Sequence, residues 1–407
     1  MADQRRVRQP EVFDRFRCIG AACEDTCCAG WGIVIDRETY AKYQNLPAHR
    51  IADRPLIDLV EISPAGSPPG DYARFRMREA RCPALHEGLC SIQRTLGEPY
   101  IPNLCSTYPR VLSVINGVVE RSLQLSCPEA ARLVLTNPEA MIFHEGTEAE
   151  LLHRDGSLIP VAGDPDDCVT RVRALMIEMI QDRSLPLWQR ILSLGFAVEK
   201  LAGVDMTHAA AILERGSFDH LSRAYKPDAT FQLETVLELV VTRIGSDYTS
   251  PRFLECYRDF MLGLGWTAES TMEELAARYS IASESYFLPF IGSHEHLLEN
   301  YLVSYIFRTV FPYRSRLPEK QSAIDSSPES MKHALVLLAV HYAIIRTVLI
   351  GMAALHKNSL SADHAVKLVQ SYSKAFLHST AFEGAAIQYL EKNAGDATRG
   401  LAQLVMD

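Results

Sequence analysis

Cysteine is the residue type whose distribution in this sequence departs furthest from the ordinary. Eight of the ten cysteines stand in the first 127 residues, and four of these fall within eleven residues. The eight are Cys18, Cys23, Cys27, Cys28, Cys82, Cys90, Cys105 and Cys127. Thiolates are natural ligands of zinc and of iron–sulfur clusters. We therefore predict a metal centre built from these eight thiols, as one site or two.

Disulfide bonding and inert burial are the two alternatives to metal ligation. A disulfide scaffold fits poorly, because a chain of 407 residues has enough apolar sequence to form a core without crosslinks. Inert buried thiols fit less well than metal ligands, because free cysteines rarely cluster without a chemical reason. The basic start of the sequence is followed by no continuous apolar segment, so we expect a cytoplasmic protein with reduced thiols.

The spacing of the cysteines favours iron–sulfur over zinc. Structural zinc sites prefer paired C-x2-C motifs, whereas here the spacings are C-x4-C, C-x3-C, an adjacent pair and C-x7-C. We expect an iron–sulfur cluster, with 4Fe-4S favoured and zinc as the alternative. The C-x3-C-x2-C signature of radical S-adenosylmethionine enzymes is not met, because Gly30 stands where its third thiol would be.

The four clustered cysteines need not be the ligand set. Successive side chains point apart in most backbone conformations, so we expect Cys27 and Cys28 to diverge. At least one ligand is then expected from Cys82, Cys90, Cys105 or Cys127. Metal binding energy can also serve as folding energy, so the sequence leaves open whether the centre is structural or catalytic.

The sequence pattern around and beyond these thiols predicts a mainly α protein with an irregular first part. Residues 1–140 read as a loop-rich cysteine-cluster domain with short β elements, 141–167 as a polar linker and 168–407 as an all-α domain. Within the first part, Asn116-Gly117 between two β-rich runs predicts a hairpin over 110–125. Pro128 begins a short helix that extends to 135.

Apolar residues at three- and four-residue spacing predict the helices of the second part. These are 168–181, 186–202, 231–244, 252–264, 272–279, 294–311, 329–355, 362–377 and 382–392. The run from Ala334 to Leu355 approaches the length of a membrane span, but Arg346 lies in its middle. A charge there costs about 2.5–3.5 kcal/mol in a bilayer. We therefore expect a buried core helix in which Arg346 meets a carboxylate or solvent, and no membrane partner.

Charge narrows the class of partner. The formal net charge of −9 argues against general nucleic-acid binding, which needs a surplus of Lys and Arg on one face. The arginine-rich start, Arg5 to Arg17, is expected to be a solvated arm, with an acidic partner as the alternative. The sequence does not indicate an oligomeric state.

The cysteine motifs resemble those of the flagellin lysine-N-methylase family, densely over residues 13–135 and sparsely thereafter. The N-terminal part is also similar to cysteine-cluster families described as zinc- or iron-chelating domains. The resemblance rests on Cys18 to Trp31 with Ile33 and Asp36, Arg81-Cys82-Pro83, Gly88 to Gln93, Cys105 with Tyr108-Pro109-Arg110, and Ser126 to Arg132.

The resemblance implies an enzyme that transfers methyl groups from S-adenosylmethionine to lysines of flagellin and carries an iron–sulfur cluster. No Gly-rich loop follows a predicted strand, so the cofactor site would be unconventional; Gly263 and Gly265 follow a helix and are expected to cap it. The catalytic residues stay unknown. The alternative is a non-enzymatic iron–sulfur or zinc protein that senses redox state or metal and binds a partner through its helical domain.

Overall fold

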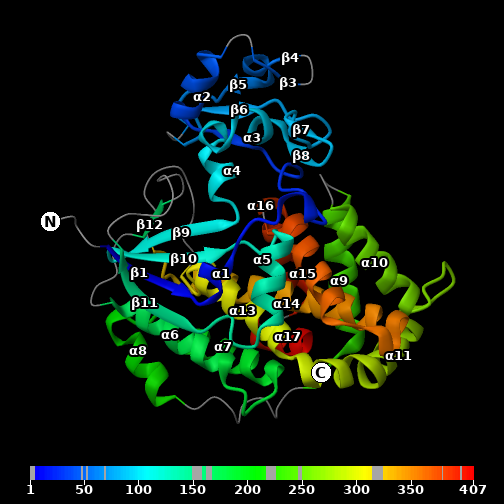
Figure 1. Ribbon diagram of the computed structural model, residues 1–407. Helices are drawn as coiled ribbons and strands as arrows, with labels where there is room; N and C mark the ends of the chain where they lie inside the picture. The colour runs from blue at the N-terminus through cyan, green and yellow to red at the C-terminus, as the bar shows by residue number, and fades with distance from the viewer. Residues whose placement is uncertain are drawn as a thin grey trace.

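The computed structural model shows a large helical body that carries a small, irregular unit on one side (Figure 1). It describes residues 5–46, 49–51, 54–67, 70–148, 158–161, 167–216, 226–245, 250–313, 324–377, 379–394 and 397–407. The prediction of a mainly α protein with short β elements in its N-terminal part is confirmed. The buried apolar residues within these ranges divide into two main cores, one in each part of the molecule.

The small unit contains little regular structure. It holds the three-stranded sheet β2-β6-β5, short hairpins and short helical segments. Its elements are β2 (Val34–Ile35), α2 (Arg37–Gln44), β3 (Arg50–Ile51), β4 (Arg54–Pro55), η2 (Leu56–Leu59), β5 (Val60–Ile62), β6 (Ala73–Phe75), β7 (Leu85–His86), β8 (Leu89–Cys90), α3 (Ser91–Leu96) and η3 (Glu98–Tyr100). The short helix α4 (Asn103–Thr107) leads from this unit to the body.

A five-stranded sheet with the order β11-β1-β10-β9-β12 lies on the helical body. Its strands are β1 (Arg5–Pro10), β9 (Arg110–Ile115), β10 (Val118–Leu123), β11 (Phe143–Glu148) and β12 (Leu158–Val161). The predicted hairpin is confirmed: β9 and β10 pair antiparallel around Asn116 and Gly117, both with positive φ. Strand β1 pairs with β10 and β11, so the solvated arm expected at the start of the chain is wrong. Two strands also occupy the stretch predicted as a linker.

The helices of the body agree closely with the periodicity of the sequence. They are α1 (Val12–Arg15), α5 (Pro128–Thr136), α6 (Cys168–Gln181), α7 (Leu187–Leu201), α8 (Met206–Arg215), α9 (Ala229–Ile244), α10 (Pro251–Gly263), α11 (Met272–Ala282), α12 (Leu288–His294), α13 (His296–Thr309), α14 (Pro328–His356), α15 (Ala362–Phe376), α16 (Thr380–Asn393) and α17 (Ala397–Val405). A π-helical segment, Ser283–Phe287, joins α11 to α12. Helices α1, α8, α12 and α17 were not predicted from the sequence.

Helix α14 is the centre of the body. In the part of the chain that the structure describes, it alone has the length and apolar composition of a membrane span, and its apolar window is wholly buried by the rest of the protein. Arg346 is 1% exposed and donates to the carboxylate of Asp407 at 2.6 and 3.0 Å and to Tyr279 Oη at 2.9 Å. The expected carboxylate partner of Arg346 is thus present.

Close backbone contact holds α10 against α14. A Cβ atom at Gly263 would lie 1.9 Å from the carbonyl oxygen of Gly351, and one at Gly351 would lie 2.4 Å from the ring of Phe260. Glycine at these two positions therefore lets the helices approach. Gly265 follows with a φ of +58°. The expected end of the helix at this glycine pair is confirmed.

Candidate metal centre

Backbone pairing between two distant loops places Cys28 beside Cys82. The amide of Cys82 donates to the carbonyl oxygen of Cys28 at 2.8 Å, and the amide of Gly30 donates to that of Ala80 at 2.9 Å. A single antiparallel bridge joins Ala29 to Arg81 between these bonds. Hydrogen bonds of the main chain therefore bring together the cysteine-rich loop and the second cysteine motif.

Backbone amides at the start of a helix or turn lower the pKa of three of the cysteines against the opposing effect of burial. Cys90 is the N-cap of α3, and the amides of Ile92 and Gln93 lower the pKa of its thiol, although burial raises that pKa overall. Cys127 is the N-cap of α5, and Cys82 precedes a tight turn; two nearby amides lower the pKa of each of these thiols in the same way. Free amides at a helix N-terminus favour negative charge. These three sulfurs are therefore positioned to act as thiolate ligands.

The eight thiols fall into two groups according to which of them shift one another's pKa values. The five-thiol group contains Cys27, Cys28, Cys82, Cys90 and Cys105. The three-thiol group contains Cys18, Cys23 and Cys127. The buried ring of Tyr108 interacts with members of both groups. The structure thus brings together residues from separate motifs, and the expectation that sequence-distant thiols join the clustered ones is consistent with this arrangement.

The adjacent cysteines do not diverge as expected. A turn at residues 27 and 28 folds the two side chains toward each other, and the thiol of Cys28 hydrogen-bonds to Cys27. The expectation rested on the alternation of an extended chain, which a turn does not follow. Cys27 and Cys28 are therefore close enough to share one centre.

The pKa values of the five thiols differ in a way that singles out Cys27. The hydrogen bond from Cys28 lowers the pKa of Cys27 to about 7 against the opposing effect of burial, and the Lys374 ammonium also lowers it. Burial raises the pKa of Cys82 to about 12 and holds that of Cys105 well above its ordinary value. Cys27 is thus the thiol of this group most readily ionised in the metal-free protein.

The donor chemistry of the five-thiol group suits an iron–sulfur cluster, because its members are all sulfur and backbone amides lower the pKa of two of them. Its geometry is not that of a closed ligand shell. Among the residues that the structure describes, no three His, Cys, Asp or Glu side chains are arranged to hold a metal ion. His86 lies on a hairpin and is half exposed, beside Glu87.

The helical body fastens the cysteine-rich loop through α15. Lys374 Nζ donates to Asp25 Oδ1 and to the carbonyl oxygen of Thr26, both at 2.8 Å. Gln370, one turn earlier, donates to Asp25 Oδ2 at 2.9 Å and to the carbonyl oxygen of Ser126 at 3.0 Å. Lys374 is 7% exposed. One face of α15 therefore holds both the loop before Cys27 and the residue before Cys127.

These contacts add residues that sequence reasoning missed. Asp25 and Lys374 are 349 positions apart, and a lysine in a helical pattern gives no local sign of such a partner. Asp36 was named in the family resemblance, but its partner was not: it caps α2 and accepts from the amide of Asn103 at 2.9 Å, which ties α4 and its Cys105 to the small unit. Burial raises the pKa of Asp36, but its hydrogen bonds outweigh burial and hold the pKa below its usual value.

The fold and the site define a mainly α protein in which a thiol-rich unit is bonded to a large helical body. Residues 173–404, more than half of the chain, match the family described as FliB lysine N-methylase C-terminal domain. The chain belongs to this family. The resemblance drawn from residues 13–135 is thereby confirmed, and the family match itself lies in the helical part.

Curated relatives match over shorter stretches. The chain is similar to the lysine-N-methylases of Salmonella typhimurium (strain LT2) and Salmonella choleraesuis, each 32% identical over 160 residues. These stretches are 38% of this chain and 38% of each relative, so the match spans about two fifths of the length of those relatives. It is 33% identical over 145 residues to the flagellar biosynthetic protein FliU of Salmonella muenchen, covering 34% of this chain and 82% of that protein. No solved structure matches.

Proposed function

We propose that this protein is an S-adenosylmethionine-dependent lysine N-methyltransferase that acts on surface lysines of flagellin and carries an iron–sulfur cluster. The observation that carries the proposal is the family match over residues 173–404. The names of the relatives, lysine-N-methylase and flagellar biosynthetic protein, support the reaction and a flagellar substrate. The ten free thiols support the cytoplasm as the compartment.

The reaction sets one requirement for the site. The methyl carbon leaves the sulfonium sulfur as its C–S bond breaks, and the lysine nitrogen forms the new bond with its lone pair. The amine must first lose a proton, although the unperturbed pKa of lysine is about 10.4. Desolvation or a base can lower that pKa, and positioning of the two reactants lowers the barrier further.

The five-thiol group is where this chain would hold the cluster. An iron–sulfur cluster supplies either one-electron transfer or a crosslink between loops when bound. The amides that lower the pKa of Cys82 and Cys90 would stabilise the negative charge of the ligating sulfurs. Lys374 would add a buried positive charge beside Cys27 and hold its loop on the body.

The test is a methylation assay on anaerobically purified protein. Flagellin is incubated with the protein and S-adenosylmethionine and then digested, and lysine-containing peptides are weighed by mass spectrometry. We expect mass increases of whole methyl groups on surface lysines, with an equal yield of S-adenosylhomocysteine. Flagellin that stays unmodified while S-adenosylmethionine does not bind in calorimetry contradicts the enzyme.

The same assay separates the second candidate function, a redox or metal sensor. The contact of Lys374 with Asp25 favours this candidate, because it links the thiol loop directly to a helix of the body. A sensor would bind metal and alter the exposure of its helices without modifying flagellin. Metal-dependent changes in hydrogen exchange along α15, in the absence of any methyl transfer, would support it.

A further inference from the structure

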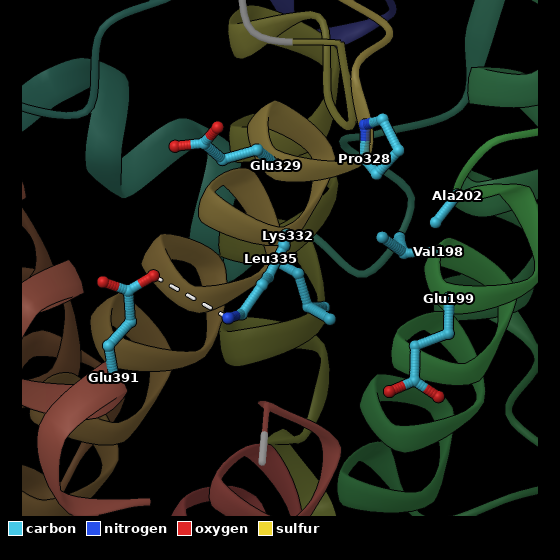
Figure 2. A pocket seen from close by; sticks show the side chains of 8 residues that line it. All are labelled: Val198, Glu199, Ala202, Pro328, Glu329, Lys332, Leu335 and Glu391. Atoms are coloured by element: carbon cyan, nitrogen blue, oxygen red, sulfur yellow. Dashed lines mark ion pairs between the residues drawn. The ribbon is translucent and has the colours of Figure 1, made fainter. Parts of the chain in front are cut away.

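A pocket opens on the helical body, apart from the cysteines, where α7, α14 and α16 meet. It has a volume of about 430 Å³, within the range of about 300–1,000 Å³ typical of ligand sites. Its lining residues are Val198, Glu199, Ala202, Pro328, Glu329, Lys332, Leu335 and Glu391. Figure 2 shows Glu391 and Glu199 on opposite sides of Leu335, with the α14 residues between them.

The floor of the pocket is apolar. Val198 and Leu335 are each 2% exposed, so their side chains belong to the core and present a fixed surface. Ala202 and Pro328 are exposed and form the apolar part of the rim. Such a surface suits an aliphatic chain, because burying apolar surface is favourable in proportion to its area.

The polar part of the lining is acidic. It consists of Glu199, Glu329 and Glu391 together with Lys332, so carboxylates outnumber the one ammonium among these residues. Glu391 Oε1 lies 3.7 Å from Lys332 Nζ and 3.5 Å from His333 Nε2, and the side chains of Lys332 and Glu391 remain nearly half exposed (Figure 2). A pair with this exposure is weak and can exchange partners. The pocket therefore combines an aliphatic floor with three carboxylates, one of which, Glu391, is shared by Lys332 and His333.

We propose that this pocket binds a lysine side chain of the protein substrate, with its methylene stem on Val198 and Leu335 and its ammonium at the carboxylates. Lysine is the side chain that pairs an aliphatic stem with a compact cation. The choice of lysine as the bound side chain rests on the proposed function. The bound residue is a docking lysine of the substrate segment, and the pocket carries no assigned step of methyl transfer.

The first test measures binding without catalysis. The probe is a fluorescein-labelled peptide with a single lysine, and its partner carries norleucine, which keeps the stem and lacks the charge. We expect the lysine peptide to bind more tightly by fluorescence anisotropy, and its advantage to shrink as salt is raised. Equal binding of the two peptides would overturn the proposal.

Substitutions at the rim of the pocket are expected to change the affinity for the lysine peptide in opposite directions. Combining Glu199→Gln with Glu391→Gln is expected to weaken lysine-peptide binding by about tenfold, as expected for loss of one charge-assisted hydrogen bond. Lys332→Met removes the competing ammonium and is expected to tighten binding. The matched control is Glu273→Gln, an exposed carboxylate on α11 outside the pocket, which should leave binding unchanged.

A substitution that blocks the pocket sterically gives an independent test of the binding site. Ala202→Trp places a large side chain at an exposed rim position, so it fills the pocket without disturbing the core. It should abolish the preference for the lysine peptide and raise the KM for flagellin more than it lowers kcat. If the preference survives in both Ala202→Trp and the double glutamate variant, the pocket is not the lysine site.

Two outcomes distinguish a failure of the pocket from a failure of the enzyme. Lysine-peptide binding that depends on the rim, in a protein that transfers no methyl group, supports the pocket and contradicts the enzyme. Methyl transfer with an unchanged KM in the rim variants supports the enzyme and contradicts the pocket.

Discussion

The small unit and the helical body differ in what stabilises their folds. The described core of the small unit contains 13 buried residues that are mostly aliphatic, spread over Ile33 to Ile101 and joined by loops. The body packs a far larger core around α14 and satisfies its buried charges internally, as with Arg190 and Glu299, both 1% exposed. A small apolar core supplies little stability by itself. We therefore expect the small unit to depend on ligation by its thiols, whereas the body does not.

The largest expected effect is unfolding of the small unit alone on loss of one of its thiols. Cys82→Ser should remove a central ligand of the five-thiol group and with it metal binding energy of order 10 kcal/mol, so residues 28–105 lose protection in hydrogen exchange. The helices of the body should keep theirs. The matched control is Cys256→Ala, a fully buried thiol of α10, which should leave metal content unchanged. Equal protection of residues 28–105 in both variants would contradict the dependence on ligation.

The next largest effect is a loss of stability of the helical body when a buried ion pair is removed. Glu299 accepts from Arg190 at 2.7 Å and from Arg183 at 2.7 Å. Glu299→Leu leaves a buried guanidinium short of a partner, so the free energy of unfolding should fall by about 3–5 kcal/mol in urea titration. Arg171→Met breaks an exposed pair with Glu214 and should cost less than about 1 kcal/mol. Similar losses in the two variants would show that burial is not what makes the first pair matter.

A smaller effect tests the connection between the two regions. Lys374→Met removes both bonds to the loop at Asp25 and Thr26, so residues 23–28 should exchange amide hydrogens faster while α10 and α14 do not. Lys374→Arg keeps the charge and should restore part of the protection. If Lys374→Met leaves exchange in the loop unchanged, α15 does not fasten it.

The smallest expected effect is a pH dependence confined to the body. Burial lowers the pKa of His364, and the nearby His356, whose ring centroid is 4.2 Å away, lowers it further, while Asp259 opposes both. The unfolded chain therefore binds the proton more readily, and stability falls as the pH drops below about 6.5. His364→Gln should reduce the loss between pH 7 and pH 5 in thermal unfolding. An unchanged slope in that variant would exclude His364 as the cause.

Local patterns predicted the elements that local interactions decide. The helix α6 was expected at 168–181 and is found there, because apolar periodicity and flanking polar turns define it. Asn116-Gly117 predicted the hairpin because its backbone conformation requires those residue types. Helix α8 carries a capping signal at Asp205 that could have revealed it.

The features that the sequence did not predict depend on contacts between segments that are distant in the chain. Strand β1 carries arginines and ends at Pro10, and it becomes a strand only because β10 and β11 flank it. The eight cysteines were identified from composition, yet the placement of Cys28 beside Cys82 depends on the bridge between Ala29 and Arg81. The contact of Asp25 with Lys374 joins segments with no shared pattern.

The most direct test of the central claim is the metal content of the anaerobically purified full chain. Iron and acid-labile sulfide are assayed together with an absorption spectrum, for the unaltered protein and for Cys82→Ser. We predict a coloured protein with iron and sulfide in equal amounts, and a colourless variant. A colourless unaltered protein that contains zinc or no metal would contradict the dependence of the small unit on an iron–sulfur cluster.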